Sequence, residues 1–236
     1  AIARIDKLIA RIPNNALVRN LKGEALANLK RTDLAIASFR EAIALSPSWT
    51  VPYRSLATTE SAADRNEDAI KALEDGIKAS NGAPELISDL AELYERIGRP
   101  DAAIAVYENL LKADPDSAAS ANNLAMLLVT YRSDKASLDR ARSMTERFAS
   151  SRNPAFIDTW GWVLYKRGEF AEAVTALQKA VDKAPQAPVL LYHLAMAQLK
   201  SGARDSARIN LDQALKSGVA FNGSDEAKKT LAELKR

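Results

Sequence analysis

Residues 160–185 read Trp-Gly-Trp-Val-Leu-Tyr-Lys-Arg-Gly-Glu-Phe-Ala-Glu-Ala-Val-Thr-Ala-Leu-Gln-Lys-Ala-Val-Asp-Lys-Ala-Pro, and this stretch decides the fold. Small residues stand at Gly161 and Ala173, and a large one stands at Leu177. Gly168 falls where a first helix would turn, and Pro185 falls where a second helix would stop. The stretch therefore predicts two short helices that pack closely against each other.

The same arrangement recurs along the chain with a period of 34 residues. Its four marker positions fall at Gly23, Ala35, Phe39 and Ala42, at Ala57, Ala69, Leu73 and Gly76, at Ala91, Ala103, Tyr107 and Leu110, and at Ala195, Ala207, Leu211 and Ala214. The small residues let the two helices of a pair approach each other, and the large residue fills the gap to the next pair. Because one pair cannot bury its apolar stripe alone, successive pairs are expected to stack.

The composition agrees with a helical array and excludes several kinds of site. The 236 residues are 47% hydrophobic and only 6% aromatic, which favours closely packed helices over a sandwich or barrel. There is no Cys, so disulfides, iron–sulfur clusters and a Cys nucleophile are excluded, and a single His argues against a zinc site. The net charge is +3, with basic and acidic residues interspersed, so no nucleic-acid-binding stripe stands out. We expect no metal, no cofactor and no catalytic residue.

These repeats resemble the tetratricopeptide repeat family. The resemblance implies an all-α fold, a right-handed superhelical solenoid of antiparallel helix pairs. Six repeats are expected over residues 14–218. The fourth, residues 118–153, is expected to be irregular, because its second helix (138–148) arrives late after a longer loop (132–135).

Both ends of the chain also carry predictions. Residues 1–13 fit the second helix of a preceding repeat whose first helix is missing, so we interpret the chain as a piece of a longer array. The apolar edge left there is expected to favour self-association. Residues 219–236 are predicted to form a C-terminal capping helix, with Ser224 as its N-cap.

The C-terminal half bears a closer resemblance. Residues 158–165, Asp-Thr-Trp-Gly-Trp-Val-Leu-Tyr, are similar to a signature of bacterial envelope repeat proteins, including lipoproteins found with exopolysaccharide and PEP-CTERM sorting systems. Residues 122–125 and 192–197 are similar to neighbouring segments of the same proteins. The resemblance favours a periplasmic or outer-membrane-associated location over the cytoplasm. The first residues do not read as a signal peptide, so an export signal would lie outside this chain.

The resemblance also predicts which residues line the concave face. In this family that face comes from the second, fifth, sixth, ninth, twelfth and thirteenth residues of each repeat. Repeats one to three then present a polar, mostly acidic floor, which includes Asn20, Glu24, Arg54, Glu85, Asp89, Glu92 and Glu95. Repeats four to six present a floor of aromatic, Met and hydrogen-bonding residues, and we predict the partner-binding site there: Asn122, Asn123, Met126, Val129, Asp158, Trp162, Tyr165, Tyr192, His193 and Met196. For Trp162 and Met196, packing in the core is an equally weighted alternative.

Three functions are open at this point. The first is a non-catalytic scaffold that binds a peptide or partner protein in its concave groove, within a bacterial multiprotein complex. The second is a structural or assembly factor for exopolysaccharide secretion or surface-protein export. The third is an accessory repeat domain of an enzyme whose catalytic part lies outside this chain. Neither nucleic acid nor membrane insertion is expected. The acids of the first floor disfavour the family's carboxylate-tail clamp, and its Asn ladder is unsupported because only Asn123 matches.

Overall fold

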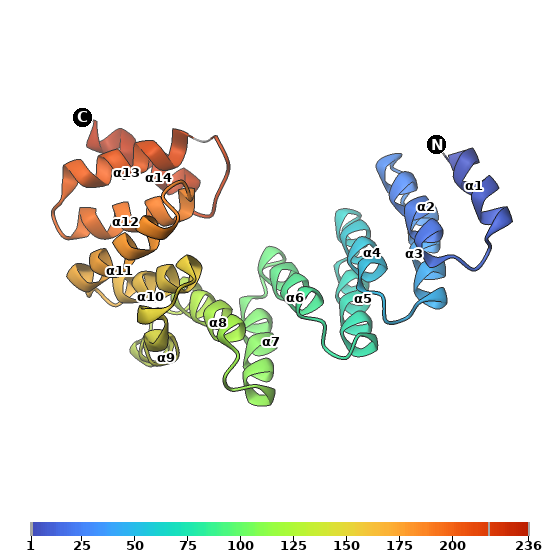
Figure 1. Ribbon diagram of the computed structural model, residues 1–236, viewed down its shortest axis with the longest axis horizontal. Helices are drawn as coiled ribbons and strands as arrows, with labels where there is room; N and C mark the ends of the chain where they lie inside the picture. Colours follow the sequence, from blue (N-terminus) through green and yellow to red (C-terminus); the bar gives the residue numbers. More distant parts are fainter. Residues whose placement is uncertain (1, 217, 236) are drawn as a thin grey trace. The chain divides into compact units, whose positions relative to one another are not determined.

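The computed structural model of this chain, drawn in Figure 1, describes residues 2–216 and 218–235 and is helical throughout the repeats. The first helices are α1 (Ile2–Arg11), α2 (Ala16–Asn28), α3 (Thr32–Leu45), α4 (Thr50–Ala62), α5 (Asn66–Ala79), α6 (Pro84–Arg96) and α7 (Pro100–Ala113). They are followed by α8 (Ala118–Tyr131), α9 (Lys135–Thr145), the 3-10 helix η1 (Glu146–Ser150), α10 (Pro154–Lys166), α11 (Phe170–Lys183), α12 (Pro188–Lys200), α13 (Arg204–Lys216) and α14 (Ser224–Leu234). The predicted all-α array of helix pairs is confirmed.

The chain divides into two compact units. Residues 1–106 form the N-terminal unit and residues 107–236 the C-terminal unit, with the boundary inside α7. In the N-terminal unit α2 packs mainly on α3, and α4 mainly on α5. In the C-terminal unit the corresponding pairs are α8 with α9, α10 with α11, and α12 with α13. Each first helix therefore lies against the second helix of its own repeat, as the marker positions predict.

The local sequence explains where the first helices begin. Pro84, Pro154 and Pro188 are the first residues of α6, α10 and α12, where their fixed φ suits the helix and no amide donor is lost. Other helices start behind a side-chain cap. Asn15 accepts a hydrogen bond from the amide of Val18, 3.1 Å away, and caps of this kind stabilise a helix by about 1 kcal/mol.

The marker positions form the cores of both units. Five Ala residues at the same marker position are completely buried, at 0% exposure: Ala35, Ala69, Ala103, Ala173 and Ala207. The large residues that follow them are almost as deeply buried, and Phe39, Leu73, Leu177 and Leu211 are at most 2% exposed. A side chain longer than Ala at the small positions would separate the paired helices, so the repeat period follows directly from helix packing.

The turn between paired helices requires one residue in the left-handed region. Gly98, Gly168 and Gly202 fill this place with φ of 73°, 84° and 89°, as predicted. In the first two repeats the same place holds Lys30 and Asp64, at φ of 57° and 59°. L-residues adopt this conformation at a cost that glycine avoids. The turn geometry is therefore set by the packing of the helices, and the glycines make it easier to reach.

The predicted start of the second helix of the fourth repeat is wrong. We predicted a longer loop at residues 132–135 and a second helix that starts near Leu138. In the structure α9 already begins at Lys135, because the Asp134 carboxylate caps it by accepting a hydrogen bond from the amide of Ser137 at 2.9 Å. The departure comes at the other end, where α9 gives way after Thr145 to the 3-10 helix η1.

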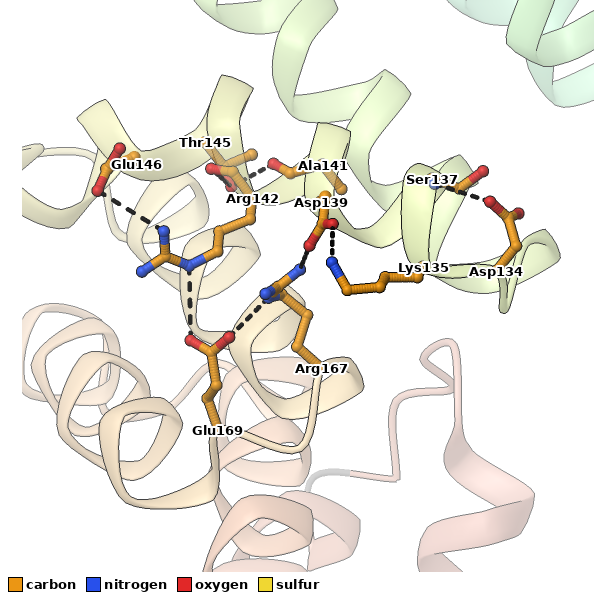
Figure 2. A network of polar contacts seen from close by, with 10 residues as sticks. All are labelled: Asp134, Lys135, Ser137, Asp139, Ala141, Arg142, Thr145, Glu146, Arg167 and Glu169. Carbon is orange, nitrogen blue, oxygen red and sulfur yellow. Dashed lines mark hydrogen bonds and ion pairs between the residues drawn. The ribbon is translucent and has the colours of Figure 1, made fainter.

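Ion pairs hold α9 in the C-terminal unit (Figure 2). Arg167, at the end of α10, is paired with Asp139 of α9 and also with Glu169, whose Oε1 is 2.6 Å from Arg167 Nε. Arg142 of α9 lies 3.5 Å from the other oxygen of Glu169. The hydrogen bonds from Lys135 and Arg167 keep the pKa of Asp139 below its ordinary value. These polar contacts therefore supply part of the stabilisation that a more apolar helix would gain by burying its side chains.

The helix α1 packs on α2, and no side chain of α1 is buried. Ile2, Ile5 and Ile9 are half-buried, and Ile2 lies against the core of the N-terminal unit. Leu8 and Ile12 remain exposed at 40% and 41%. Self-association through this edge stays a prediction.

At the other end of the chain, the predicted N-cap Ser224 is wrong. Gly223 occupies the capping position with φ of 96°, and Ser224 is the first residue of α14. The Ser224 hydroxyl is hydrogen-bonded to the backbone of Phe221 instead.

Glu60 of α4 carries a carboxyl group buried at 1% exposure. One oxygen accepts a hydrogen bond from Arg40 at 3.1 Å, and the other has no partner in the structure. Burial raises the pKa of Glu60, although the nearby Arg40 opposes the shift. Since the folded-state pKa is the higher one, the folded protein holds this proton more tightly than the unfolded chain. The free energy of unfolding therefore falls as the pH rises from the pKa of Glu60 in the unfolded chain to its higher pKa in the folded protein.

We expect Glu60→Gln to raise the free energy of unfolding at pH 7 by up to about 1 kcal/mol, because it removes a buried charge with an unsatisfied oxygen. The gain should shrink as the pH falls toward 4, where the wild-type carboxyl is itself neutral. Urea unfolding at a series of pH values measures this. The exposed Glu74→Gln is the control, and a gain that does not change with pH would contradict the assignment.

Candidate functional site

The aromatic residues predicted as a binding wall meet in one cluster in the C-terminal unit. Trp162 of α10 is stacked between Tyr165, with ring centroids 4.6 Å apart, and His193 of α12, at 3.9 Å. Tyr192 lies beside both Trp162 and His193, and the ring of Phe221 lies 5.7 Å from Tyr192. We call Trp162, Tyr165, Tyr192, His193 and Phe221 the aromatic cluster.

Asp158 and His193 form a buried pair inside this unit. The Nδ1 atom of His193 is 3.0 Å and 2.9 Å from the two carboxylate oxygens of Asp158, and both side chains are less than 10% exposed. The adjacent Thr159 hydroxyl donates to the carbonyl of Ala155, so it is not directed at the histidine. No group of three metal-ligating side chains occurs in residues 2–216 and 218–235. The pair is a polar link between α10 and α12.

The C-terminal segment lies against the same cluster. The hydroxyl of Tyr192 donates a hydrogen bond to the Glu226 carboxylate of α14 at 2.6 Å. Burial, reinforced by this bond, raises the pKa of Tyr192. Gly223 approaches the Tyr192 ring so closely that a Cβ there would overlap it. Phe221, Gly223 and Glu226 therefore cover the end of the predicted wall.

The structure brings five of the ten predicted site residues together, namely Asp158, Trp162, Tyr165, Tyr192 and His193, and it leaves none of the ten fully exposed. Six of them are buried: Val129, Asp158, Trp162, Tyr192, His193 and Met196. The other four are half-buried: Asn122, Asn123, Met126 and Tyr165. Two of these bond within the unit, since Asn123 donates to the Tyr107 hydroxyl at 3.0 Å and Asn122 donates to Asn123 at 3.1 Å. As the structure stands, the wall is packed like a core, and a binding role for it stays a prediction.

An open cavity lies on the polar floor of the N-terminal unit. It has a volume of about 540 Å³ and is lined by the three first helices α2, α4 and α6. Four residues of the polar floor lie on it, namely Glu24, Arg54, Asp89 and Glu92. Between them the cavity reaches the apolar side chains of Phe39, Ala57, Leu73 and Leu93. The cavity thus combines charged walls with an apolar base.

The charged side chains of the cavity are tied across neighbouring repeats. Arg54 of α4 is paired with Asp89 of α6 through two nitrogens that contact both carboxylate oxygens. This pair occupies the same repeat positions, fifth and sixth, as Asp158 and His193 in the C-terminal unit. Thr50 also donates to Glu85 of α6, 2.9 Å away. In both units, the fifth residue of one repeat is therefore paired with the sixth residue of the next repeat. The pair is exposed to solvent in the N-terminal unit and buried in the C-terminal unit.

The ninth residue of each repeat explains why one floor is open and the other filled. In the first, second and third repeats it is Glu24, Thr58 and Glu92, respectively, and all three line the cavity. In the fourth, fifth and sixth repeats it is Met126, Trp162 and Met196, respectively. A large apolar side chain at this place fills the space between first helices, because it gains free energy by leaving water. Our sequence reasoning missed Ser55, Thr58 and Arg96 as lining residues, and the size of the ninth residue is the signal that could have found the cavity.

Comparisons with known proteins agree with this geometry. Family models described as "Tetratricopeptide repeat" match residues 1–48, 61–127 and 164–234, which is well over half of the chain. The chain belongs to the tetratricopeptide repeat family. No curated protein matches it.

Solved structures show the same TPR fold. A tetratricopeptide repeat protein from Parabacteroides merdae has a TM-score of 0.67 at 13% identity, with 100% of this chain and 91% of that chain covered. The TPR protein TTC0263 from Thermus thermophilus has a TM-score of 0.62 at 20% identity, with 78% and 100% covered. The APC/C hetero-tetramer Cut9–Hcn1 has a TM-score of 0.62 at 15% identity, with 96% and 45% covered. At these identities the likeness shows the fold alone.

A TPR fold is consistent with protein binding, and the family is typically non-catalytic. Among the described residues, no helix combines the length and the apolar character needed to cross a bilayer. The partner-binding question therefore concerns the concave faces of the two TPR units.

Proposed function

We propose that this TPR chain is a non-catalytic scaffold that holds a segment of a partner protein in the cavity formed by α2, α4 and α6. The observation that carries the proposal is the cavity itself, which reaches across three successive repeats. Ligand pockets in proteins occupy roughly 300–1,000 Å³, and the volume of about 540 Å³ suits several side chains of an extended segment.

The lining chemistry supports a peptide as the occupant. Ser55, Thr58 and Thr59 place hydroxyl groups beside the apolar base, and Arg54, Asp89 and Glu92 supply charge at the walls. A peptide presents backbone donors and acceptors together with side chains, so it can use both kinds of surface. A chain of the same fold was solved as part of the APC/C hetero-tetramer Cut9–Hcn1, which is in keeping with a role in assembly. The signatures at residues 122–125, 158–165 and 192–197 favour a bacterial multiprotein complex as the setting.

A photo-crosslinking amino acid at Thr58 tests the proposal in the full chain. Thr58 is exposed and lies on the cavity. We expect a covalent adduct with one partner protein in the native host. The same crosslinker at the exposed Glu74 of α5, outside the cavity, should give no adduct with that partner. Ser55→Trp fills the cavity and should abolish the adduct at Thr58, while circular dichroism confirms that the helices remain. Equal adducts at both positions, or an adduct that survives Ser55→Trp, would contradict the proposal.

A further inference from the structure

We infer that the segment held in this cavity is basic, with Lys or Arg side chains flanking a small apolar residue. The inference rests on the proposed function, because it names the partner chemistry of the same cavity. Its first support is the balance of charge. Glu24, Asp89 and Glu92 face two basic groups, Arg54 and Arg96, on the cavity lining, and Glu85 lies in the first turn of the same helix as Asp89.

The cations of the cavity form an ion pair with only one of its three acids. Arg54 is paired with Asp89 through two nitrogens. Arg96 donates to the hydroxyl of Ser61 at 2.8 Å, and no carboxylate is its partner there. Glu24 accepts a hydrogen bond from the amide of Asn20 at 2.7 Å, and Asn20 carries no charge to offset it. Within the described residues, neither Glu24 nor Glu92 forms an ion pair, so two carboxylates on opposite helices are left for a cation.

The surroundings of Arg54 reflect the same excess of negative charge. The hydrogen bond to Asp89 is the main reason why the pKa of Arg54 lies above its ordinary value. The charges of Asp89, Glu85 and Glu92 raise it further. Three carboxylates therefore act on a single guanidinium group, and a second cation placed among them would be attracted for the same reason.

The apolar residues of the cavity limit the size and polarity of the partner residue that lies between the basic side chains. The apolar lining residues include Phe39, Ala57, Leu73 and Leu93. Val51, which is 39% exposed, extends the apolar surface to the cavity edge. A small apolar side chain can therefore be buried there while its charged neighbours reach Glu24 and Glu92. An acidic segment would meet like charges at both walls and is selected against.

Three fluorescein-labelled peptides test this inference by fluorescence anisotropy with the full chain. The basic probe is Gly-Ser-Lys-Leu-Lys-Ala-Lys-Ser-Gly, and the matched probes carry Gln or Glu in place of every Lys. We expect the basic probe to bind at least about tenfold more tightly than the Gln probe, and the Glu probe to bind most weakly. Binding of the basic probe should weaken as salt is added, because the acids of the cavity are in contact with solvent.

Two sets of variants assign the binding to these acids. The double variant Glu24→Gln with Glu92→Gln keeps the shape of the side chains. We expect it to lower the affinity for the basic probe by about tenfold or more. Glu74→Gln removes an acid of the same unit outside the cavity and should have no effect. The inference is overturned if the Gln or Glu probe binds as tightly as the basic one, if the double variant binds unchanged, or if the basic probe does not bind.

Ser55→Trp distinguishes failure of the inferred preference for basic segments from failure of the proposed function. If it blocks whichever probe binds, the cavity holds peptides, and only the preference for basic segments is lost. If the basic probe binds equally well with the cavity filled, the peptide site lies elsewhere, and the proposed function fails together with the inference.

Discussion

Gly161→Leu is expected to unfold the C-terminal unit at a much lower urea concentration than the wild type. A Cβ at Gly161 would lie 2.6 Å from Cγ and 2.8 Å from Cδ2 of Leu177, and 3.2 Å from the Leu177 backbone nitrogen. The neighbouring side chain can give way, but the backbone nitrogen belongs to the partner helix α11 and can move only with it. Overpacking costs about 1–3 kcal/mol and sometimes more, and the backbone contact places this substitution at the upper end.

The measurement is urea unfolding followed by circular dichroism, with Ala171→Leu as the matched control. Ala171 lies in α11 and is exposed, so the same enlarged side chain there points into water and should change the midpoint little. Gly161→Ala should fall between the two, since it adds the Cβ alone. Equal midpoints for Gly161→Leu and Ala171→Leu would show that α10 and α11 do not meet at Gly161.

Trp162→Ala is expected to be the second strongly destabilising change. Trp162 is 7% exposed and is stacked on both Tyr165 and His193. Removing its indole leaves a cavity next to the buried Asp158–His193 pair, and substitutions of this kind cost about 3–5 kcal/mol. The binding-wall interpretation of the sequence predicts a different result, a loss of partner binding with little change in the helical signal, whereas the alternative interpretation, core packing of Trp162, predicts this one.

Trp162→Phe serves as the control, since it retains an aromatic ring in the stack and should cost much less than the alanine variant. Both variants are followed by urea unfolding and by near-ultraviolet circular dichroism, which reports the packing of the aromatic cluster. A Trp162→Ala protein that unfolds like the wild type would place the indole at the surface and would support the predicted binding wall.

The sequence alone was enough to predict the architecture, because the architecture depends on contacts between residues that are close along the chain. The 34-residue period placed the small residues that are now found fully buried, including Ala35, Ala69 and Ala173. Pro185 marked the end of a second helix, which is α11, and Gly168 marked a turn with φ of 84°. Helix caps, proline positions and the approach of paired helices act within about one repeat, so they can be read from the local sequence.

The sequence misplaced the start of α9 because part of the support for this helix comes from another repeat. Residues 132–135 hold no apolar side chain, and the absence of an apolar stripe suggests a loop. Asp134 instead caps the helix, and the pairing of Asp139 with Arg167, 28 residues away, holds α9 in place. Apolar periodicity does not reveal this kind of support, because it comes from charges on another repeat.

Which of the two floors is open depends on the tertiary structure. The sequence placed the residues of both floors on first helices. Whether Trp162 and Met196 face a partner or fill a core depends on how closely the first helices approach each other. It depends as well on Phe221 and Glu226, which come from a later segment and cover Tyr192. Large apolar side chains fill the space between first helices, because burial removes them from water. The side chains of Glu24, Thr58 and Glu92 stay hydrated, and the space beside them stays open.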